Sequence, residues 1–151
     1  MKIYLVFCFI LCSLSSAFSQ DLWAVSKVVD GDTFYAFSEG NKKKFRIIGV
    51  DTPEFSYFGK PEEPYAKEAK NFLKELIEHK FVLLSYDIQP LDKYGRSLVY
   101  VYLQDSTFVN AELMKHGWAI TMTIPPNVSH ADLFLELQKS ARRAKRGIWQ
   151  D

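Results

Sequence analysis

Short apolar runs separated by turn residues make up most of the first half of the chain. Val, Ile, Phe and Tyr alternate with polar residues in these runs, and Asp30-Gly31 and Gly40-Asn41 are turn dipeptides between the first three. The expected strands are 22–29, 33–37, 44–50, 81–86 and 98–103.

Helical spacing of apolar residues appears in three places. Residues 69–77 carry apolar side chains at steps of three and four, with Lys and Glu on the other face. A second helix is expected over 109–116, ending at Gly117, which suits a left-handed cap.

The third helix is expected to open at Ser129, with Asp132 three residues on as the acid of a capping box, and to end at Gly147. Its expected buried stripe is Leu133, Leu137, Ala141 and Ala144.

Five short strands with three helices around them predict the α+β class, in the form of a small closed or nearly closed barrel. The hairpin spacing suggests an antiparallel Greek-key order.

The N-terminus has the features of a secretory signal peptide. Lys2 precedes an apolar run over 3–14 that is too short to span a bilayer, and Ala17 and Ser19 are small residues at the cleavage site. We expect a signal peptide at 1–19 and one domain at 20–151, with an uncleaved anchor as the alternative. The mature protein is then secreted or periplasmic, with no membrane association.

Cysteine content and net charge limit how the domain can be stabilised and how it can attract phosphates. Both cysteines, Cys8 and Cys12, fall inside the signal peptide, so the domain must be stabilised by its core or by a bound ion. The chain has a net charge of +1, and the loss of Lys2 makes the domain formally neutral. Attraction to phosphates must therefore come from local clusters such as 42–44 and 142–146.

Acidic residues stand at the ends of two predicted strands. Asp30 and Asp32 flank Gly31, and Asp51 follows the third strand, three residues before Glu54. Carboxylates together with a backbone carbonyl suit a hard cation such as Ca²⁺. The same residues are also ordinary turn formers, and each motif by itself leaves both interpretations open.

Two arginines help to decide between a cation site and ordinary turns. Arg46 lies inside an apolar strand, where an unpaired charge is costly. Its guanidinium either forms a structural salt bridge or binds phosphate oxygens bidentately. Arg96, beside a tight turn, is open to the same interpretations or to simple solvation.

Three motifs in order resemble the staphylococcal nuclease (thermonuclease) family. They are Val-Asp-Gly-Asp-Thr at 29–33, Arg-Ile-Ile-Gly-Val-Asp-Thr-Pro-Glu at 46–54 and Asp-Lys-Tyr-Gly-Arg at 92–96, and the likeness extends from Trp23 to Trp149. The resemblance implies a five-stranded oligonucleotide-binding (OB) barrel with three helices. It also implies Ca²⁺-dependent hydrolysis of DNA and RNA that leaves 3′-phosphates.

The resemblance also implies residue roles. Asp32, Asp51 and the Thr52 carbonyl match the Ca²⁺ ligands, and Asp30 matches an acid near the metal. Arg46 and Arg96 match the phosphate-binding arginines, and Glu54 matches the general base or the residue that orients water. Lys93 and Tyr94 match residues near the terminal phosphate. We expect a monomer that prefers single-stranded or frayed nucleic acid.

One departure stands out. The family has tyrosines ahead of a proline-asparagine loop, whereas Met122 and Ile124 occupy that region here. Stacked aromatic side chains contribute about 1–3 kcal/mol per base. We therefore expect weaker base stacking and an altered base preference, with the chemistry retained.

Two other functions stay open at this point. The chain could be a nuclease-like barrel that binds nucleic acid or a protein without cutting, or a domain whose Asp pair holds Ca²⁺ for stability alone. Glu54 separates them from the enzyme, because neither of them needs this carboxylate.

Overall fold

A computed structural model describes residues 21–56 and 58–150, so the predicted signal peptide lies outside the described residues. Within them no helix is long and apolar enough to cross a membrane. The strands are β1 (Asp21–Val28), β2 (Thr33–Ser38), β3 (Asn41–Ile47), β4 (Gly49–Asp51), β5 (Phe81–Ser85), β6 (Ser97–Leu103) and β7 (Ile120–Met122). The helices are α1 (Ala66–Ile77), α2 (Val109–Lys115), α3 (Ala131–Arg143) and the 3-10 helix η1 (Gly147–Trp149).

Five strands form a closed barrel in the order β1-β2-β3-β6-β5, and β5 pairs with β1 to close it. The predicted α+β class, five-stranded OB barrel and three helices are confirmed. The expected antiparallel order is wrong at one pair, because β3 and β6 run parallel. A parallel pair needs a long crossover, and here α1 and β5 lie in the connection.

Aromatic side chains fill the centre of the barrel. Phe34 and Phe45 are fully buried and stack with ring centroids 5.3 Å apart. Trp23 and Phe45 pack in a T-shaped arrangement, with ring centroids 4.9 Å apart. Aromatic pairs in these arrangements contribute about 0.5–1.5 kcal/mol beyond the burial of their area.

The strand expected over 44–50 is two strands that meet at Ile48. Ile48 N–H donates to the Val99 carbonyl of β6, and the buried Asn110 side chain donates to the Ile48 carbonyl at 2.9 Å. Gly49 then takes a left-handed φ of 78° and turns the chain away from the barrel. The turned segment, β4, pairs with β7, a strand that the sequence pattern did not predict.

The first two helices follow the sequence closely. The interior face of α1 is formed by the predicted apolar residues, with Leu73 and Ile77 fully buried. α2 ends before Gly117, whose φ is 74°, and Trp118 N–H bonds back to Leu113. Both predicted helices and the left-handed cap are confirmed.

The third helix differs in three ways from the expectation. His130 is its N-cap and no side chain caps it, so the capping box of Ser129 and Asp132 is wrong. Phe134 and Ala141 are its buried residues. The helix ends at Arg143 rather than at Gly147, and Lys145 takes the left-handed position with φ of 50°.

The predicted stripe of α3 is also partly wrong, because Leu133 and Ala144 are exposed. The Phe134 ring takes the interior place and packs against Gly49, where a Cβ would collide with it.

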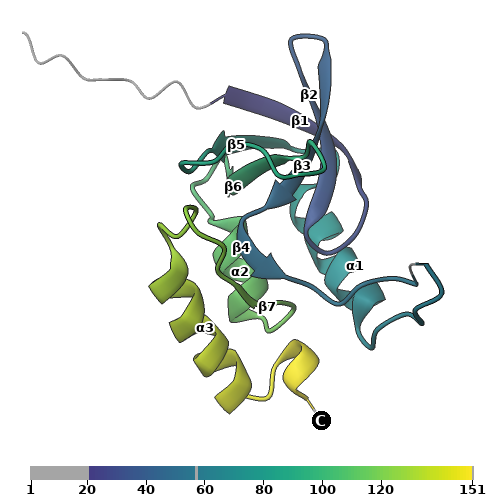
Figure 1. Cartoon of the computed structure of the whole chain (residues 1–151), viewed down its shortest axis with the longest axis vertical. Coiled ribbons are helices and arrows are strands. Elements are labelled where there is room, and N and C mark those ends of the chain that lie inside the picture. Colours follow the sequence, from purple (N-terminus) through teal and green to yellow (C-terminus); the bar gives the residue numbers. More distant parts are fainter. Residues whose placement is uncertain (1–20, 57, 151) are drawn as a thin grey trace, which may run out of the picture.

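The helices lie on one side of the barrel. In Figure 1, α2 lies under the barrel between α1 and α3, and the small β4–β7 sheet lies beside α2. The β2–β3 hairpin extends from the opposite side. The start of β2, the end of β3 and the β4–β7 sheet therefore surround the region in which the predicted acids and Arg46 lie.

Candidate active site

The turn between β1 and β2 places two acids at the edge of the barrel. Asp30 Oδ1 accepts a hydrogen bond from Asp32 N–H at 3.1 Å, which fixes the turn. Between them, a Cβ at Gly31 would lie 2.6 Å from Thr52 Oγ1. Only glycine allows this close approach of the two segments, so Asp-Gly-Asp is both a turn and a site element.

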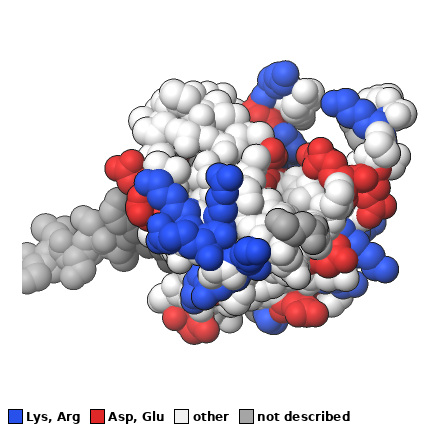
Figure 2. Space-filling model, turned by 90° about the horizontal axis from the view of Figure 1, so that it is seen from below, with Lys and Arg blue, Asp and Glu red and all other residues white. Residues whose placement is uncertain are grey.

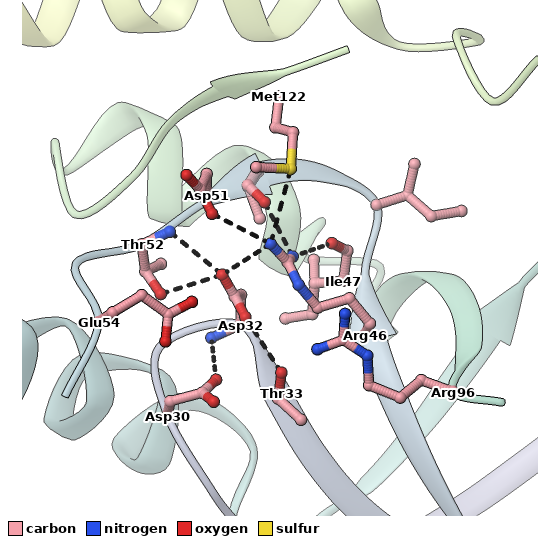
Figure 3. Close-up of polar contacts among 12 residues, drawn as sticks. Asp30, Asp32, Thr33, Arg46, Ile47, Asp51, Thr52, Glu54, Arg96 and Met122 are labelled. Atoms are coloured by element: carbon pink, nitrogen blue, oxygen red, sulfur yellow. Dashed lines mark hydrogen bonds and ion pairs between the residues drawn. The ribbon is translucent and has the colours of Figure 1, made fainter. Parts of the chain in front are cut away.

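Asp32 is almost fully buried and is held on all sides. Its carboxylate accepts hydrogen bonds at 3.1 Å from the Thr33 hydroxyl and from the N–H and hydroxyl of Thr52. The Arg46 Nη2 atom lies 3.0 Å from Asp32 Oδ2. These contacts, drawn in Figure 3, satisfy a charge that would otherwise be costly to bury.

Arg46 is the centre of the cluster and is only 8% exposed. Its Nη1 donates to the carbonyls of Ile47 at 2.6 Å and Val50 at 2.8 Å. Its Nη2 lies between Asp32 and Asp51 Oδ1, the latter at 3.3 Å, and also contacts Met122 Sδ at 4.0 Å. The guanidinium therefore forms the structural ion pair, and it is also aimed into the site.

Negative charge exceeds positive charge in this cluster. Burial, followed by the charge of Asp32, raises the pKa of Asp30 to about 6. Burial also raises the pKa of Asp51, although Arg46 offsets part of the shift. The pKa of Glu54 is raised by partial desolvation and then by Asp32 and Asp51. Four carboxylates around one guanidinium favour a further cation.

The donor set fits a hard cation. Asp32 and Asp51 are close enough for both carboxylates to contact Arg46 Nη2, and the Thr52 backbone follows Asp51 directly, so these oxygen donors are grouped in one region. In the ranges 21–56 and 58–150, no three His, Cys, Asp or Glu side chains form a metal-binding group by themselves. The predicted set needs only two carboxylates and one carbonyl, to which water adds the remaining oxygens of a Ca²⁺ site.

Arg96 comes from a turn before β6. Asp92 Oδ1 accepts hydrogen bonds from the N–H groups of Tyr94 and Arg96, each at 2.9 Å. Asp92 Oδ2 lies 2.6 Å from Arg96 Nε. Burial raises the pKa of Asp92, but the hydrogen bonds from Arg96 and Tyr94 outweigh burial and lower it. Asp92 thus orients the guanidinium, a role that sequence reasoning did not assign to it.

The segment before this turn is held by the buried Asn127. Its Oδ1 accepts from Gln89 N–H, and its Nδ2 donates to the Gln89 carbonyl, both at 2.8 Å. Sequence reasoning missed Asn127 as a positioning residue. The only available signal was an asparagine after two prolines, which is also an ordinary loop sequence.

Glu63, in the loop after Glu54, forms hydrogen bonds with the Glu54 backbone. Glu54 N–H donates to Glu63 Oε2 at 3.0 Å, and Glu63 N–H donates to the Glu54 carbonyl at 2.9 Å. These bonds fix the Glu54 backbone while its side chain stays exposed. Sequence reasoning did not identify Glu63.

A cavity of about 440 Å³ brings most of the predicted residues together. Asp32 and Thr52 are buried behind it. Among its walls are the predicted residues Arg46, Asp51, Glu54, Lys93, Tyr94 and Arg96, and the apolar residues Leu98, Met122, Ile124 and Pro125.

The two predicted substrate-binding residues lie at the rim of the cavity. Tyr94 is 72% exposed. Lys93 Nζ lies 5.0 Å from the centre of its ring, and Arg96 Cζ lies 5.5 Å from it. The turn therefore presents two cations and an aromatic ring together, a combination that suits a nucleotide.

Comparison with known proteins shows the family of the chain. The family model described as "Staphylococcal nuclease homologue" matches residues 44–151. The thermonuclease of Staphylococcus intermedius is 41% identical over 85% of this chain and 76% of its own length. The thermonuclease of Staphylococcus hyicus is 38% identical over 91% and 80%. The SPbeta prophage-derived endonuclease YokF of Bacillus subtilis is 34% identical over 83% of this chain and 43% of its own length.

Proposed function

Because the chain belongs to the staphylococcal nuclease family, we propose that it is a Ca²⁺-dependent nuclease that hydrolyses the phosphodiester bonds of DNA and RNA and leaves 3′-phosphates. The observation that carries the proposal is the cavity itself. Two guanidinium groups, Arg46 and Arg96, face it together with the carboxylates of Asp51 and Glu54. Phosphodiester hydrolysis needs both kinds of group, since negative charge develops on phosphate oxygens while water loses a proton.

The cation would be held by Asp32, Asp51 and the Thr52 carbonyl. When bound, it supplies Lewis-acid stabilisation of a phosphate oxygen. Hydrogen bonds from Thr33 and Thr52 fix the orientation of the Asp32 carboxylate, which supports this assignment.

The arginines bind and orient the scissile phosphate. The Ile47 and Val50 carbonyls hold Nη1 of Arg46 and direct Nη2 toward the acids. Asp92 holds Nε of Arg96 and leaves the two terminal nitrogens of that guanidinium for phosphate oxygens. A donor aimed at developing charge contributes about 3 kcal/mol to transition-state stabilisation.

Glu54 accepts the proton of the attacking water. Its side chain lies at the cavity, and its backbone is fixed by Glu63. General-base assistance accelerates hydrolysis by roughly 10²–10⁴-fold.

The remaining cavity wall holds the base. Met122, Ile124 and Pro125 contribute an apolar surface there, and Tyr94 also lines the cavity. We expect such a wall to bind bases through apolar contact with less stacking energy than tyrosines would give. A base must leave its duplex to reach it, which favours single-stranded or frayed substrates.

The same proposal includes the location of the protein outside the cytoplasm. The signal at 1–19 would export the protein to the periplasm or the medium, and the domain at 20–151 would act there as a monomer. Pulse labelling with and without inhibition of signal peptidase tests the export step, because the unprocessed chain would accumulate in the cells.

The direct test is digestion of plasmid and single-stranded DNA and of RNA by the domain from Gln20, with Ca²⁺ and then with EGTA. Wild type is compared with Glu54→Gln and with Glu62→Gln, an exposed neighbour in the same loop. We expect Ca²⁺-dependent cleavage by wild type and Glu62→Gln and a loss of at least about 10²-fold in Glu54→Gln.

Two results would contradict the proposal. Cleavage that survives EGTA would remove the Ca²⁺ role. Absence of cleavage by folded wild type would favour the binding module that does not cut. Analysis of the product ends decides the bond, because 5′-phosphate ends would show that the other P–O bond breaks.

A further inference from the structure

The outer face of the β2–β3 hairpin carries an ordered set of side chains. Tyr35 pairs with Lys44, and Phe37 pairs with Lys42, in the register of these two strands. Cross-strand partners share a face of the sheet. Phe34, Ala36 and Phe45 alternate with these residues along the two strands and are fully buried, so the row lies on the opposite, outer face. We call Tyr35, Phe37, Lys42 and Lys44 the hairpin row.

Cations and rings alternate within the hairpin row. Lys42 Nζ lies 4.8 Å from the centre of the Tyr35 ring and 5.4 Å from that of Phe37. Lys44 Nζ lies 5.7 Å from the Tyr35 ring. Cation–π contacts of this kind contribute about 0.5–1 kcal/mol at exposed sites, and they hold the ammonium groups above the strand.

The hairpin row leads directly to the cavity. Arg46 lies two residues beyond Lys44 on the same face, opposite Thr33 of β2. Arg96 comes just before Ser97, which pairs with Phe45, so Arg96 stands at the level of Lys44. Positive charge therefore continues from both arginines of the cavity along the hairpin that projects from the barrel in Figure 1.

We propose that the hairpin row binds the part of a nucleic-acid strand that extends beyond the cavity. The inference rests on the proposed nuclease function, and it adds a second contact region for the same substrate. Lys42 and Lys44 would contact phosphates, and the Phe37 ring, 40% exposed, would support a base.

The dimensions agree with this assignment. From Arg46 to Lys42 the strand rises by roughly 13 Å, at about 3.3 Å per residue. This length corresponds to about four nucleotides at the 3.4 Å axial spacing of a stacked strand, and to fewer in an extended strand. A strand of three nucleotides in the cavity would thus gain little from the row, whereas a longer strand would lie along it.

A second cationic surface, at the end of α3, lacks this connection. Seen from the end at which α3 finishes, cations gather on one area of the surface (Figure 2). Two of the α3 cations are engaged locally: Arg142 lies over Trp149 at 5.4 Å, and Lys139 pairs with Glu136 at 2.7 Å. The end of α3 lies on the side of the molecule away from the β2–β3 hairpin (Figure 1).

The test uses neighbouring lysines that occupy opposite faces of β3. Lys43 stands between Lys42 and Lys44, but its side chain lies over Trp23 at 5.5 Å, on the other face of β3. The variants Lys44→Gln and Lys43→Gln have the same net charge. The double variant Lys42→Gln/Lys44→Gln measures the whole row. Each is assayed for kcat/KM on single strands of three and about twelve nucleotides.

We expect the ratio of kcat/KM on the long strand to that on the short strand to fall roughly five- to tenfold in the double variant. The slope of log affinity against log salt for the long strand should fall in magnitude by about 1.4, for two phosphate contacts. Lys43→Gln should leave the ratio at the wild-type value. Equal effects of Lys43→Gln and Lys44→Gln, or no change in the double variant, would overturn the proposal.

Binding is measured separately from cleavage. Fluorescence anisotropy of the labelled long strand in EGTA gives the dissociation constant for each variant. If wild type binds but does not cut, the nuclease proposal fails, while the contrast between Lys44 and Lys43 still decides the row. If wild type does not bind the long strand, the row is excluded as a nucleic-acid site.

Discussion

Arg46 and Arg96 face the same cavity, but different parts of the chain hold them there. Arg46 lies on a barrel strand, is 8% exposed, and contacts carbonyls and carboxylates from two strands and a turn. The Arg96 side chain is 28% exposed and is held by Asp92, four residues earlier in the same turn. Contacts from several elements of the fold hold the Arg46 guanidinium, whereas a single local turn holds that of Arg96.

This difference in contacts shows which part of the site depends on the barrel fold. Arg46 neutralises the buried Asp32, so the barrel and this ion pair need each other. The Arg96 turn needs only its own hydrogen bonds and the attachment of Gln89 to Asn127. Catalysis should use both arginines about equally, whereas stability should depend mainly on Arg46.

The largest expected effect concerns catalysis. Arg46→Lys and Arg96→Lys should each lower kcat by roughly 10²–10³-fold, because lysine cannot offer the paired donors of a guanidinium. Steady-state kinetics on single-stranded DNA measures this, with the exposed Arg143→Lys on α3 as the control. A tenfold or smaller loss in Arg96→Lys alone would show that the turn contributes binding rather than transition-state stabilisation.

Stability should separate the two arginines. Arg46→Ala leaves Asp32 buried without its cation, and we expect the free energy of unfolding to fall by about 3 kcal/mol. Arg96→Ala removes a partly exposed pair and should cost about 1 kcal/mol or less. Urea denaturation of the two proteins measures both values. Equal losses would mean that the turn is as much a part of the folding unit as β3 is.

Asp92 provides a pH-dependent test of the turn. Its pKa is lowered in the folded protein, so its stabilisation is present above the unfolded value of about 3.9 and is lost as the pH falls through the lowered pKa. Asp92→Asn should therefore cost about 1–2 kcal/mol at pH 7, and progressively less below about pH 4.

The measurement is thermal or urea unfolding of wild type and Asp92→Asn between pH 3 and 7, with Glu62→Gln as a control for loss of an exposed carboxylate. A difference that stays constant over this range would show that the Asp92 charge has no part in holding Arg96.

The smallest expected effect concerns the apolar wall. Met122→Tyr adds an aromatic ring beside Arg46, and we expect a trinucleotide to bind about fivefold more tightly, corresponding to roughly 1 kcal/mol of stacking. Ile88→Tyr, at an exposed position that does not line the cavity, is the matched control. Unchanged or weaker binding by Met122→Tyr would show that bases do not lie against β7.

Much of the barrel follows from local pattern. Alternation predicts β1 and β2 because one face of each strand is buried, and a charged residue in an apolar strand marks Arg46 for attention. Asp32, Arg46, Asp51 and Glu54 could be grouped from sequence, since each stands at or near a strand end and the family motifs include all of them. Their roles in catalysis stay predictions.

Other features depend on contacts that no local pattern encodes. Apolar residues at 133, 134, 135 and 137 leave the phase of α3 ambiguous, and the space beside Gly49 selects Phe134. β7 has three residues, too few for alternation to be recognised. Asn127 and Glu63 act on segments distant from them or on backbone groups, so their residue types alone gave no signal.

The β4–β7 pairing also has a consequence for the order in which the chain is made. All five barrel strands end by Leu103, whereas Met122 and Ile124 of the cavity wall come later in the sequence. During synthesis, every barrel strand has therefore been added before the ribosome reaches that wall. An incomplete chain lacks one side of the cavity whatever the state of its barrel, so the cavity is completed only after every barrel strand has been made.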